Sequence, residues 1–259
     1  MEVKINNKSK TSLTLYTKGV DVWYLNSLRR IIMSEVPTLA VEDLEIRKNS
    51  SILYDEIIAH RLGLTPIKTD LKSYNLPEEC KCKGKGCARC TLKLTIKAAG
   101  PQTVYASDLK SKDPKCKPVY PDIPIVKLLA GQELVIQATA MLGKGKEHSK
   151  WSPGLAHYKS FPHIELPKKV ENPEEIAKKN PKAFELKKGK LVLKKDAELL
   201  DIADSLEKDS QGTIKVTKKD DYLFFLESWG QLEPTTIMVE AMKEFEKQVE
   251  EFKKLIKKA

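Results

Sequence analysis

The alternation of apolar and polar positions near the start of the chain predicts a strand followed by a helix. Residues Ser12 to Thr17 alternate polar and apolar, as in a half-buried strand. Asp21 is placed to cap a helix, and Pro37 ends it, because the residue before a proline resists the helical region. One broad apolar face of this helix carries Trp23, Tyr24, Leu25, Leu28, Ile31 and Ile32.

From Leu44 to Leu142 the pattern changes to short β-rich runs such as LKLTIKAAG and ELVIQATAML, separated by Gly and Pro turns. This texture predicts an inserted β-rich domain. The segment from Leu166 to Lys219 differs again, with 14 lysines and 10 acidic residues. Two interpretations of that segment stay open: a small, thinly cored α/β subdomain, or a partly mobile charged insert.

The clearest single element is a helix near the C-terminus that Pro234 opens. From Thr235 to Lys258 it would be about 36 Å long. Ile237, Ala241 and Leu255 widen its apolar stripe, which favours packing against a partner's helix over packing on its own domain. A seam with spacings of four, three, four, three and four runs along it: Met238, Met242, Phe245, Val249, Phe252 and Ile256.

Charge and composition narrow the function classes. The chain has 46 basic and 36 acidic residues, a net charge of +10, but only five arginines. A surface rich in lysine indicates solubility or general attraction to polyanions more than base reading. Abundant Lys and Glu are also typical of hyperthermophiles, whose proteins keep disulfides even inside the cell. No apolar run approaches the ~20 residues that span a bilayer, and MEVKINNKSK lacks the apolar core of a secretory signal, so we expect a cytoplasmic protein.

Four of the five cysteines lie in CKCKGKGCARC, at Cys80, Cys82, Cys87 and Cys90. Gaps of one, four and two residues, with glycines between the pairs, allow four thiolates to close a tetrahedral zinc site. Such a site has no open coordination position, so the zinc would be structural. An iron–sulfur cubane, whose usual cysteine runs differ, and disulfides or empty thiols remain open as alternatives.

Other candidate residues carry weaker signals. Cys116 is unpaired and is interpreted as a small filler or a reduced thiol. The Gly- and Lys-rich loop at 142–158 could bind phosphate, but it lacks the strand and GK[ST] context of a P-loop. The four histidines, His60, His148, His157 and His163, form no ligand pattern, and no catalytic motif is present, so we expect no active site.

The stretch NSLRRIIMSEVPTLAVEDL, residues 26–44, places Asn26, Arg29 and Arg30 on an otherwise apolar helix. Charges there are either solvated or part of an interface. With HRLGLTPI (60–67), GKGKEHSKWSPG (143–154) and FFLESWGQLEPTTIMVEAM (224–242), in this order, the stretch resembles one family of DNA-directed RNA polymerase components. That family comprises the archaeal polypeptide called D, the bacterial alpha subunit and the eukaryotic third-largest subunit.

The resemblance implies an α+β fold with a discontinuous dimerisation domain of strands and long helices, residues 1–43 plus 143–165 plus 220–259. A β-rich domain with the cysteine loop is inserted at 44–142, and a ferredoxin-like subdomain occupies 166–219. It implies pairing with a smaller subunit, L in archaea, through the C-terminal seam. It also implies docking of the second-largest catalytic subunit near Asn26, Arg29 and Arg30, with small subunits N and P completing the platform.

The same resemblance assigns nucleotidyl transfer to the two largest subunits, so this chain would have no catalytic residue and would meet DNA only through the whole enzyme. Many archaeal members carry an iron–sulfur cluster in the ferredoxin-like domain. Because residues 166–219 contain no cysteine, we expect that cluster to be absent. Eukaryotic relatives resemble this chain in carrying a zinc loop in the insertion domain. A free-standing zinc nucleic-acid binder and a redox protein are the alternative functions.

Overall fold

The computed structural model has an α+β fold and describes residues 1–258 apart from 168–169, 171, 188, 195–196, 198–199, 201–202 and 211. Two compact units form along the chain. Unit 1 comprises Met1–Lys8, Thr14–Asn26 and His157–Phe225, and unit 2 comprises Ser9–Leu13, Ser27–Ala156 and Leu226–Ala259. Helix α1 (Val22–Ser34) begins in the first unit and continues in the second.

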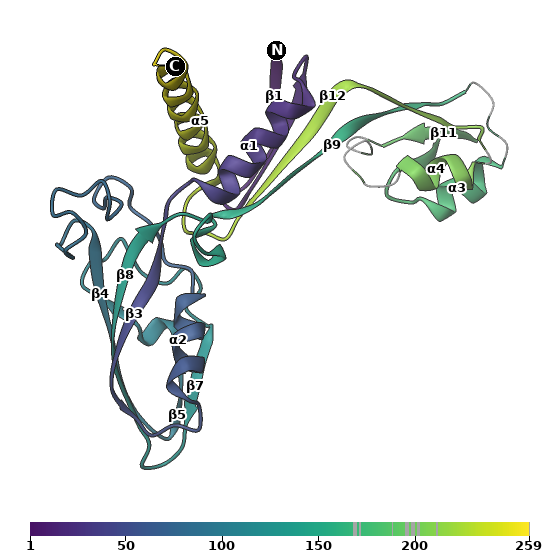
Figure 1. The fold of residues 1–259 in the computed structure, drawn as a ribbon. Coiled ribbons are helices and arrows are strands. Elements are labelled where there is room, and N and C mark those ends of the chain that lie inside the picture. Colours follow the sequence, from purple (N-terminus) through teal and green to yellow (C-terminus); the bar gives the residue numbers. More distant parts are fainter. Residues whose placement is uncertain are drawn as a thin grey trace. The chain divides into compact units, whose positions relative to one another are not determined.

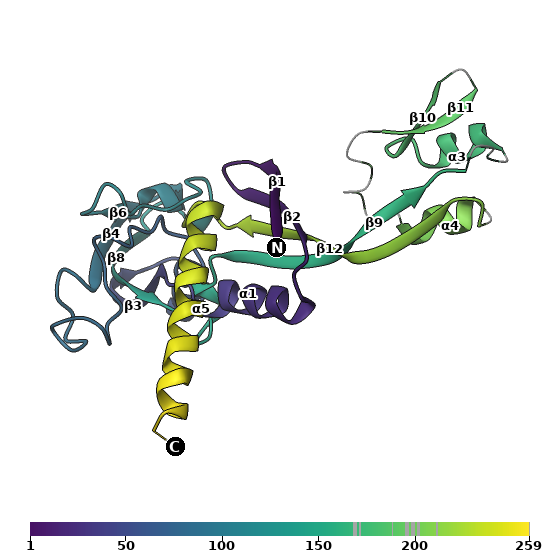
Figure 2. The same ribbon diagram turned by 90° about the horizontal axis from the view of Figure 1, so that it is seen from above.

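Unit 1 is built on a four-stranded sheet, to which a small α/β subdomain is joined (Figure 2). The sheet has the order β1-β2-β12-β9, made by β1 (Glu2–Lys8), β2 (Ser12–Lys18), β12 (Lys215–Ser228) and β9 (Gly154–Glu165). The subdomain contains α3 (Pro173–Lys179), β10 (Phe184–Lys187), β11 (Lys190–Leu193) and α4 (Ala203–Asp209). Strands β10 and β11 pair antiparallel over a core that includes Ile176, Phe184, Leu206 and Ile214.

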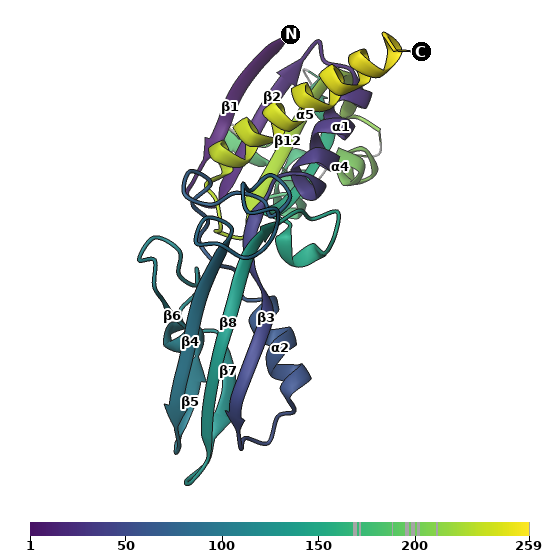
Figure 3. The ribbon, with the colours of Figure 1, turned by 60° about the vertical axis from the view of Figure 1, so that its left-hand side comes forward.

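Unit 2 is built on a second four-stranded sheet, of order β3-β8-β4-β6 (Figure 3). Antiparallel pairing places Leu39 opposite Leu142 and Ile96 opposite Ile136. Helix α2 and the β5–β7 ladder lie on one face of this sheet and enclose its apolar core (Figure 1). The elements are β3 (Thr38–Asn49), α2 (Asp55–Gly63), β4 (Thr91–Ala99), β5 (Gln102–Tyr105), β6 (Lys110–Ser111), β7 (Pro124–Leu128), β8 (Glu133–Gly143) and α5 (Pro234–Ile256).

The sequence predictions for the N-terminal elements hold, with one error. Strand β2 and helix α1 are confirmed, and Leu25, Leu28, Ile31 and Ile32 are buried. Trp23, expected on the same apolar face, is instead 65% exposed. A helix turns about 100° per residue, so Trp23 lies on the opposite side of α1 from the buried stripe.

The structure of residues 44–142 differs in two respects from the predicted β-rich domain. Strand β3 already begins at Thr38, and α2 was not expected among the strands. Within the lysine-rich segment the described residues form helices and strands around an apolar core that contains Phe184 and Leu206, as the interpretation as a small α/β subdomain predicts. Parts of that segment lie outside the described residues, and the domain boundaries and the ferredoxin-like assignment stay predictions.

Candidate functional site

The four clustered cysteines lie in two tight turns that lead into β4. The backbone N–H of Lys83 bonds the carbonyl of Cys80, and that of Cys90 bonds the carbonyl of Cys87. Gly84 and Gly86 have φ of 77° and 84°, the left-handed region that a side chain disfavours. The glycines between the pairs therefore fold the loop back, as the sequence predicted.

The Sγ atoms of this cluster approach tetrahedral geometry. Cys80 lies 3.5 Å from both Cys82 and Cys87, Cys82 lies 3.5 Å from Cys90, and Cys87 lies 3.8 Å from Cys90. All four ligand atoms fall within 4.8 Å of one another. A regular tetrahedron with Zn–S bonds of about 2.3 Å has edges of about 3.8 Å, so the four sulfurs fit around one metal ion of that size.

The environment of the sulfurs also suits metal binding. A hydrogen bond from the backbone of Cys87, assisted by the Cys90 thiol, lowers the pKa of Cys82 to about 6. Burial raises the pKa of Cys90 to about 12. Hydrogen bonds therefore favour the ionised form of one sulfur, whereas another needs a cation beside it to lose its proton, and a bound metal would supply that cation.

Two alternatives for this loop fit less well. A disulfide requires sulfurs about 2.05 Å apart, and all four cysteines are free thiols at the longer separations above. A cubane cluster, with iron and inorganic sulfide between the thiolates, needs them spread more widely than around a single ion. Cys116 does not join the group of four; it is fully buried, and burial raises its pKa to about 11.

The expected interface residues of α1 are not equally exposed. Asn26 and Arg29 are half-buried, and Arg30 is exposed. Arg29 Nη1 lies 3.9 Å from Met33 Sδ, one turn further along the helix. Only Arg30 of the three thus presents its side chain freely to solvent.

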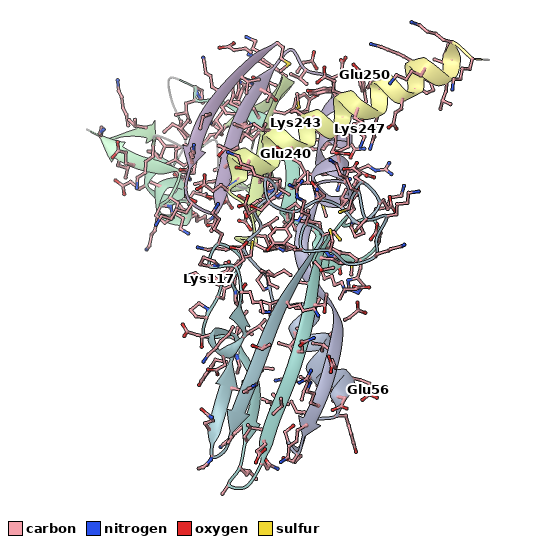
Figure 4. The ribbon with its side chains drawn as sticks, turned by 90° about the vertical axis from the view of Figure 1, so that its left-hand side faces the viewer. Glu56, Lys117, Glu240, Lys243, Lys247 and Glu250 are labelled. Carbon is pink, nitrogen blue, oxygen red and sulfur yellow. The ribbon has the colours of Figure 1, made fainter. Side chains whose placement is uncertain are left out.

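The expected seam of α5 is turned away from the apolar core of unit 2. The side chains that this helix buries are Pro234, Ile237 and Ala241, all in its first half. From Glu246 to Lys258 every residue is exposed, and Figure 4 shows the exposed charged side chains along α5, with Lys243 and Lys247 labelled. Met238 and Phe245 are half-buried, and four further seam residues are exposed: Met242, Val249, Phe252 and Ile256.

A loop between β8 and β9 contacts the middle of α5. Lys144 Nζ lies 3.2 Å from carboxylate oxygens of both Glu35 and Glu244. A Cβ on the neighbouring Gly145 would lie 2.0 Å from the carbonyl of Met33, so only glycine permits this approach to the end of α1. Because Lys144 is already held by two carboxylates, the loop gives no support to the phosphate-binding interpretation.

Two structural contacts escaped the sequence analysis. Lys247 of α5 pairs with Glu79, beside the cysteine loop, at 3.0 Å. In unit 1, the buried Asp221 accepts hydrogen bonds from Tyr16 and from the ring of His163, both at 2.8 Å. The partners are far apart in sequence, so no local pattern signals them. Within the described ranges no helix is both long and apolar enough to cross a bilayer.

Comparison with known proteins identifies the insertion. A family model described as the RNA polymerase Rpb3/RpoA insert domain matches residues 44–155. The chain is similar to DNA-directed RNA polymerase subunit Rpo3 of Pyrococcus horikoshii, 46% identical over 178 residues, which are 69% of this chain and 66% of that subunit. The Rpo3 of Methanosphaera stadtmanae is 37% identical over 249 residues, 92% of both chains. That of Pyrobaculum calidifontis is 35% identical over 265 residues, 97% of this chain and 95% of the relative.

Proposed function

The chain belongs to the archaeal family of DNA-directed RNA polymerase subunits named Rpo3, and from this membership we propose that it is the non-catalytic assembly-platform subunit of the polymerase. A member of this family works within a multisubunit complex. The activity of the whole enzyme is DNA-templated nucleotidyl transfer, carried out by the two largest subunits. This chain contributes surfaces to the complex and reaches DNA only as part of it, in the cytoplasm.

The single observation that carries the proposal is the exposed apolar seam of α5. Phe252 is 64% exposed, and Val249 and Ile256 lie on the same seam. A helix with apolar side chains at heptad spacing is stable in water when a second helix covers that stripe. We assign the covering helix to subunit L, the smaller partner in the family that the chain resembles.

Helix α1 is the proposed contact for the second-largest subunit, with subunits N and P completing the platform. Arg30 is exposed on this helix, and Trp23 lies on the same side of it. Arginine and tryptophan are among the residue types that contribute most to protein–protein interfaces. Asn26 and Arg29 belong to the same proposed contact.

The cysteine loop has a structural role in this proposal. Cys80, Cys82, Cys87 and Cys90 would hold one zinc ion, which when bound crosslinks the two turns of a loop that buries few apolar side chains. The four thiols use all the positions of a tetrahedral ion, so they hold the loop and perform no reaction. Membership of the Rpo3 family favours a polymerase subunit over the two alternative functions, a free-standing nucleic-acid binder and a redox protein.

The experiment that tests the platform role is co-expression with subunit L. We expect a one-to-one complex that elutes as a single species in size-exclusion chromatography and that is required for the second-largest subunit to bind. The chain alone should stay folded but self-associate, because its seam is uncovered. A monodisperse, folded monomer with no affinity for L would overturn the proposal.

A further inference from the structure

A groove in unit 2 lies apart from the seam of α5 and has a different chemistry. Its volume is about 710 Å³. Its walls come from the turn at Lys68–Lys72, from Val119, and from the segment Gly230–Glu240 that leads into α5, with Lys10 at the edge. Figure 4 shows Glu240 at this end of the helix.

The walls of the groove are held in place by contacts within the chain. The backbone N–H of Thr69 bonds the carbonyl of Gln231 at 2.9 Å. Gly230 has φ of 92°, and a Cβ on it would lie 2.4 Å from Cγ1 of Val119. The groove is therefore formed before anything binds in it, which lowers the entropy lost on binding.

Unpaired positive charge collects around the groove. Lys10, Lys68 and Lys72 are exposed, and none of them forms an ion pair with a residue of the described chain. The acids nearby are largely neutralised: Asp70 pairs with Lys115 at 3.3 Å, and Glu240 pairs with Lys243 at 2.7 Å. Glu233 is the remaining acid of the lining. Three free lysines against one free carboxylate favour an anionic ligand.

The N-terminus of α5 adds to this field. The helix runs from Pro234 to Ile256, and its N-cap, Glu233, makes no side-chain hydrogen bond to the first turn. No acidic residue lies in that turn. The first backbone N–H groups of the helix thus have no capping side chain, and together with the helix dipole they attract a carboxylate or a phosphate.

The side chain of Gln231 favours a carboxylate on a polypeptide over a phosphate. Its side chain lines the groove and is 5% exposed, yet Oε1 has no hydrogen-bond partner. Its Nε2 lies 3.5 Å from the carbonyl of Ser152, at the limit of a hydrogen bond. A buried acceptor without a donor is unfavourable, so a ligand in the groove that carries a hydrogen-bond donor would satisfy Oε1. A polypeptide offers backbone N–H donors directly beside its acidic side chains, whereas the phosphates of a nucleic-acid strand only accept and its donors lie on the bases, apart from the phosphates.

We propose that this groove binds an extended segment of another polypeptide through an acidic side chain. The carboxylate lies at the N-terminus of α5 among Lys10, Lys68 and Lys72, and a backbone N–H of the segment donates to Gln231. This contact goes beyond the pairing of the α5 seam and does not depend on it.

The first test is zero-length crosslinking of the assembled polymerase with a carbodiimide, which joins lysine amines to carboxylates in contact. Two ion pairs within the chain, Lys243 with Glu240 and Lys247 with Glu79, are internal positive controls. We expect mass spectrometry to find Lys10, Lys68 or Lys72 joined to an Asp or Glu of another subunit. If the control links form and these lysines are unmodified or joined only to their own chain, the proposal is wrong.

The second test uses the full chain and a fluorescent acetylated octapeptide of alternating Glu and Ala. We expect anisotropy to show binding that is about tenfold weaker when Gln replaces Glu in the peptide, and similarly weaker for the double variant Lys68→Glu, Lys72→Glu. The matched double variant Lys97→Glu, Lys127→Glu, at exposed lysines on β4 and β7, should bind like the unchanged chain. Equal weakening by both variants, or binding of a single-stranded DNA octanucleotide but not of the peptide, would overturn the proposal. Because no subunit L is present, the result does not depend on the pairing proposed for the seam of α5.

Discussion

Lys144 Nζ lies 3.2 Å from Oε2 of Glu244, although 100 positions separate the two residues. The same amine lies 3.2 Å from Glu35, at the end of α1. A single half-buried cation therefore joins α1, the β8–β9 loop and α5. This contact helps to fix the direction of α5, because few side chains of the helix are buried.

Replacing Lys144 by Met should lower the free energy of unfolding by about 1–3 kcal/mol, since two half-buried carboxylates lose their hydrogen-bond donor. Urea unfolding followed by circular dichroism measures the change. Lys146→Met is the control, because Lys146 is exposed and forms no ion pair with the described residues. An equal decrease in the free energy of unfolding in both variants would show that the ion pairs of Lys144 make no specific contribution to stability.

The Asp221 carboxylate should make the stability of the fold depend on pH in the acid range. Burial raises its pKa, but hydrogen bonds from His163 and Tyr16 outweigh burial and hold the pKa below its ordinary value. A carboxyl with a depressed pKa stabilises the fold above its unfolded pKa of about 3.9, and this stability is lost as pH falls through the folded pKa. Asp221→Asn should therefore lower stability at pH 7 and flatten the decline below about pH 4.

Thermal unfolding at a series of pH values tests this prediction. Asp220→Asn is the matched control, because Asp220 is the exposed neighbour on the same strand. A variant at Asp221 whose stability falls with acid as steeply as that of the unchanged chain would exclude the carboxylate as the source of the effect.

Phe252→Asp should separate pairing from folding. The side chain is 64% exposed, so the chain alone should keep its unfolding free energy within about 0.5 kcal/mol. In a complex, the aspartate would be buried without a partner, and the affinity for subunit L should fall by two orders of magnitude or more, roughly 3 kcal/mol. Isothermal titration or co-purification measures this loss, and Phe245→Asp, also on the seam, should weaken pairing too.

Lys253→Asp is the control for that variant. It changes the charge on the adjacent exposed position but leaves the seam intact. Full pairing by Phe252→Asp, or equal loss from Lys253→Asp, would mean that the partner does not cover the seam.

Metal analysis of the purified chain or of its complex should find one zinc ion and no iron per chain. Cys82→Ser should lose the metal, and Cys116→Ser should retain it, because Cys116 lies outside the cluster of four. Removal of zinc by a chelator should expose the loop at 80–90 to protease and leave the sheet of unit 2 folded, since that sheet has its own apolar core. Iron in place of zinc, or an unchanged metal content in Cys82→Ser, would contradict the assignment.

The sequence predicted the features that depend on residues close together in the chain. The period of residues 25–32 gave the buried face of α1, Pro234 marked the start of α5, and the cysteine spacing indicated a four-sulfur cluster. Helix α2 was missed because it is short and buries only Ile58 and Leu62, too few apolar positions to show a helical period between strands. The partners of Lys144 and the lining of the groove come together only through tertiary folding, so neither has a signal in neighbouring residues.

In the exposed half of α5, helix formation would be coupled to the binding of a partner. From Glu246 to Ile256 the helix has no buried side chain, and isolated helices of fewer than about 12–15 residues are marginal in water. A partner that binds only the helical form adds stability according to its free concentration. Under the proposed pairing, a scarce partner would leave this end of the chain to unwind and become accessible to proteases, so the supply of one subunit would regulate the lifetime of the other.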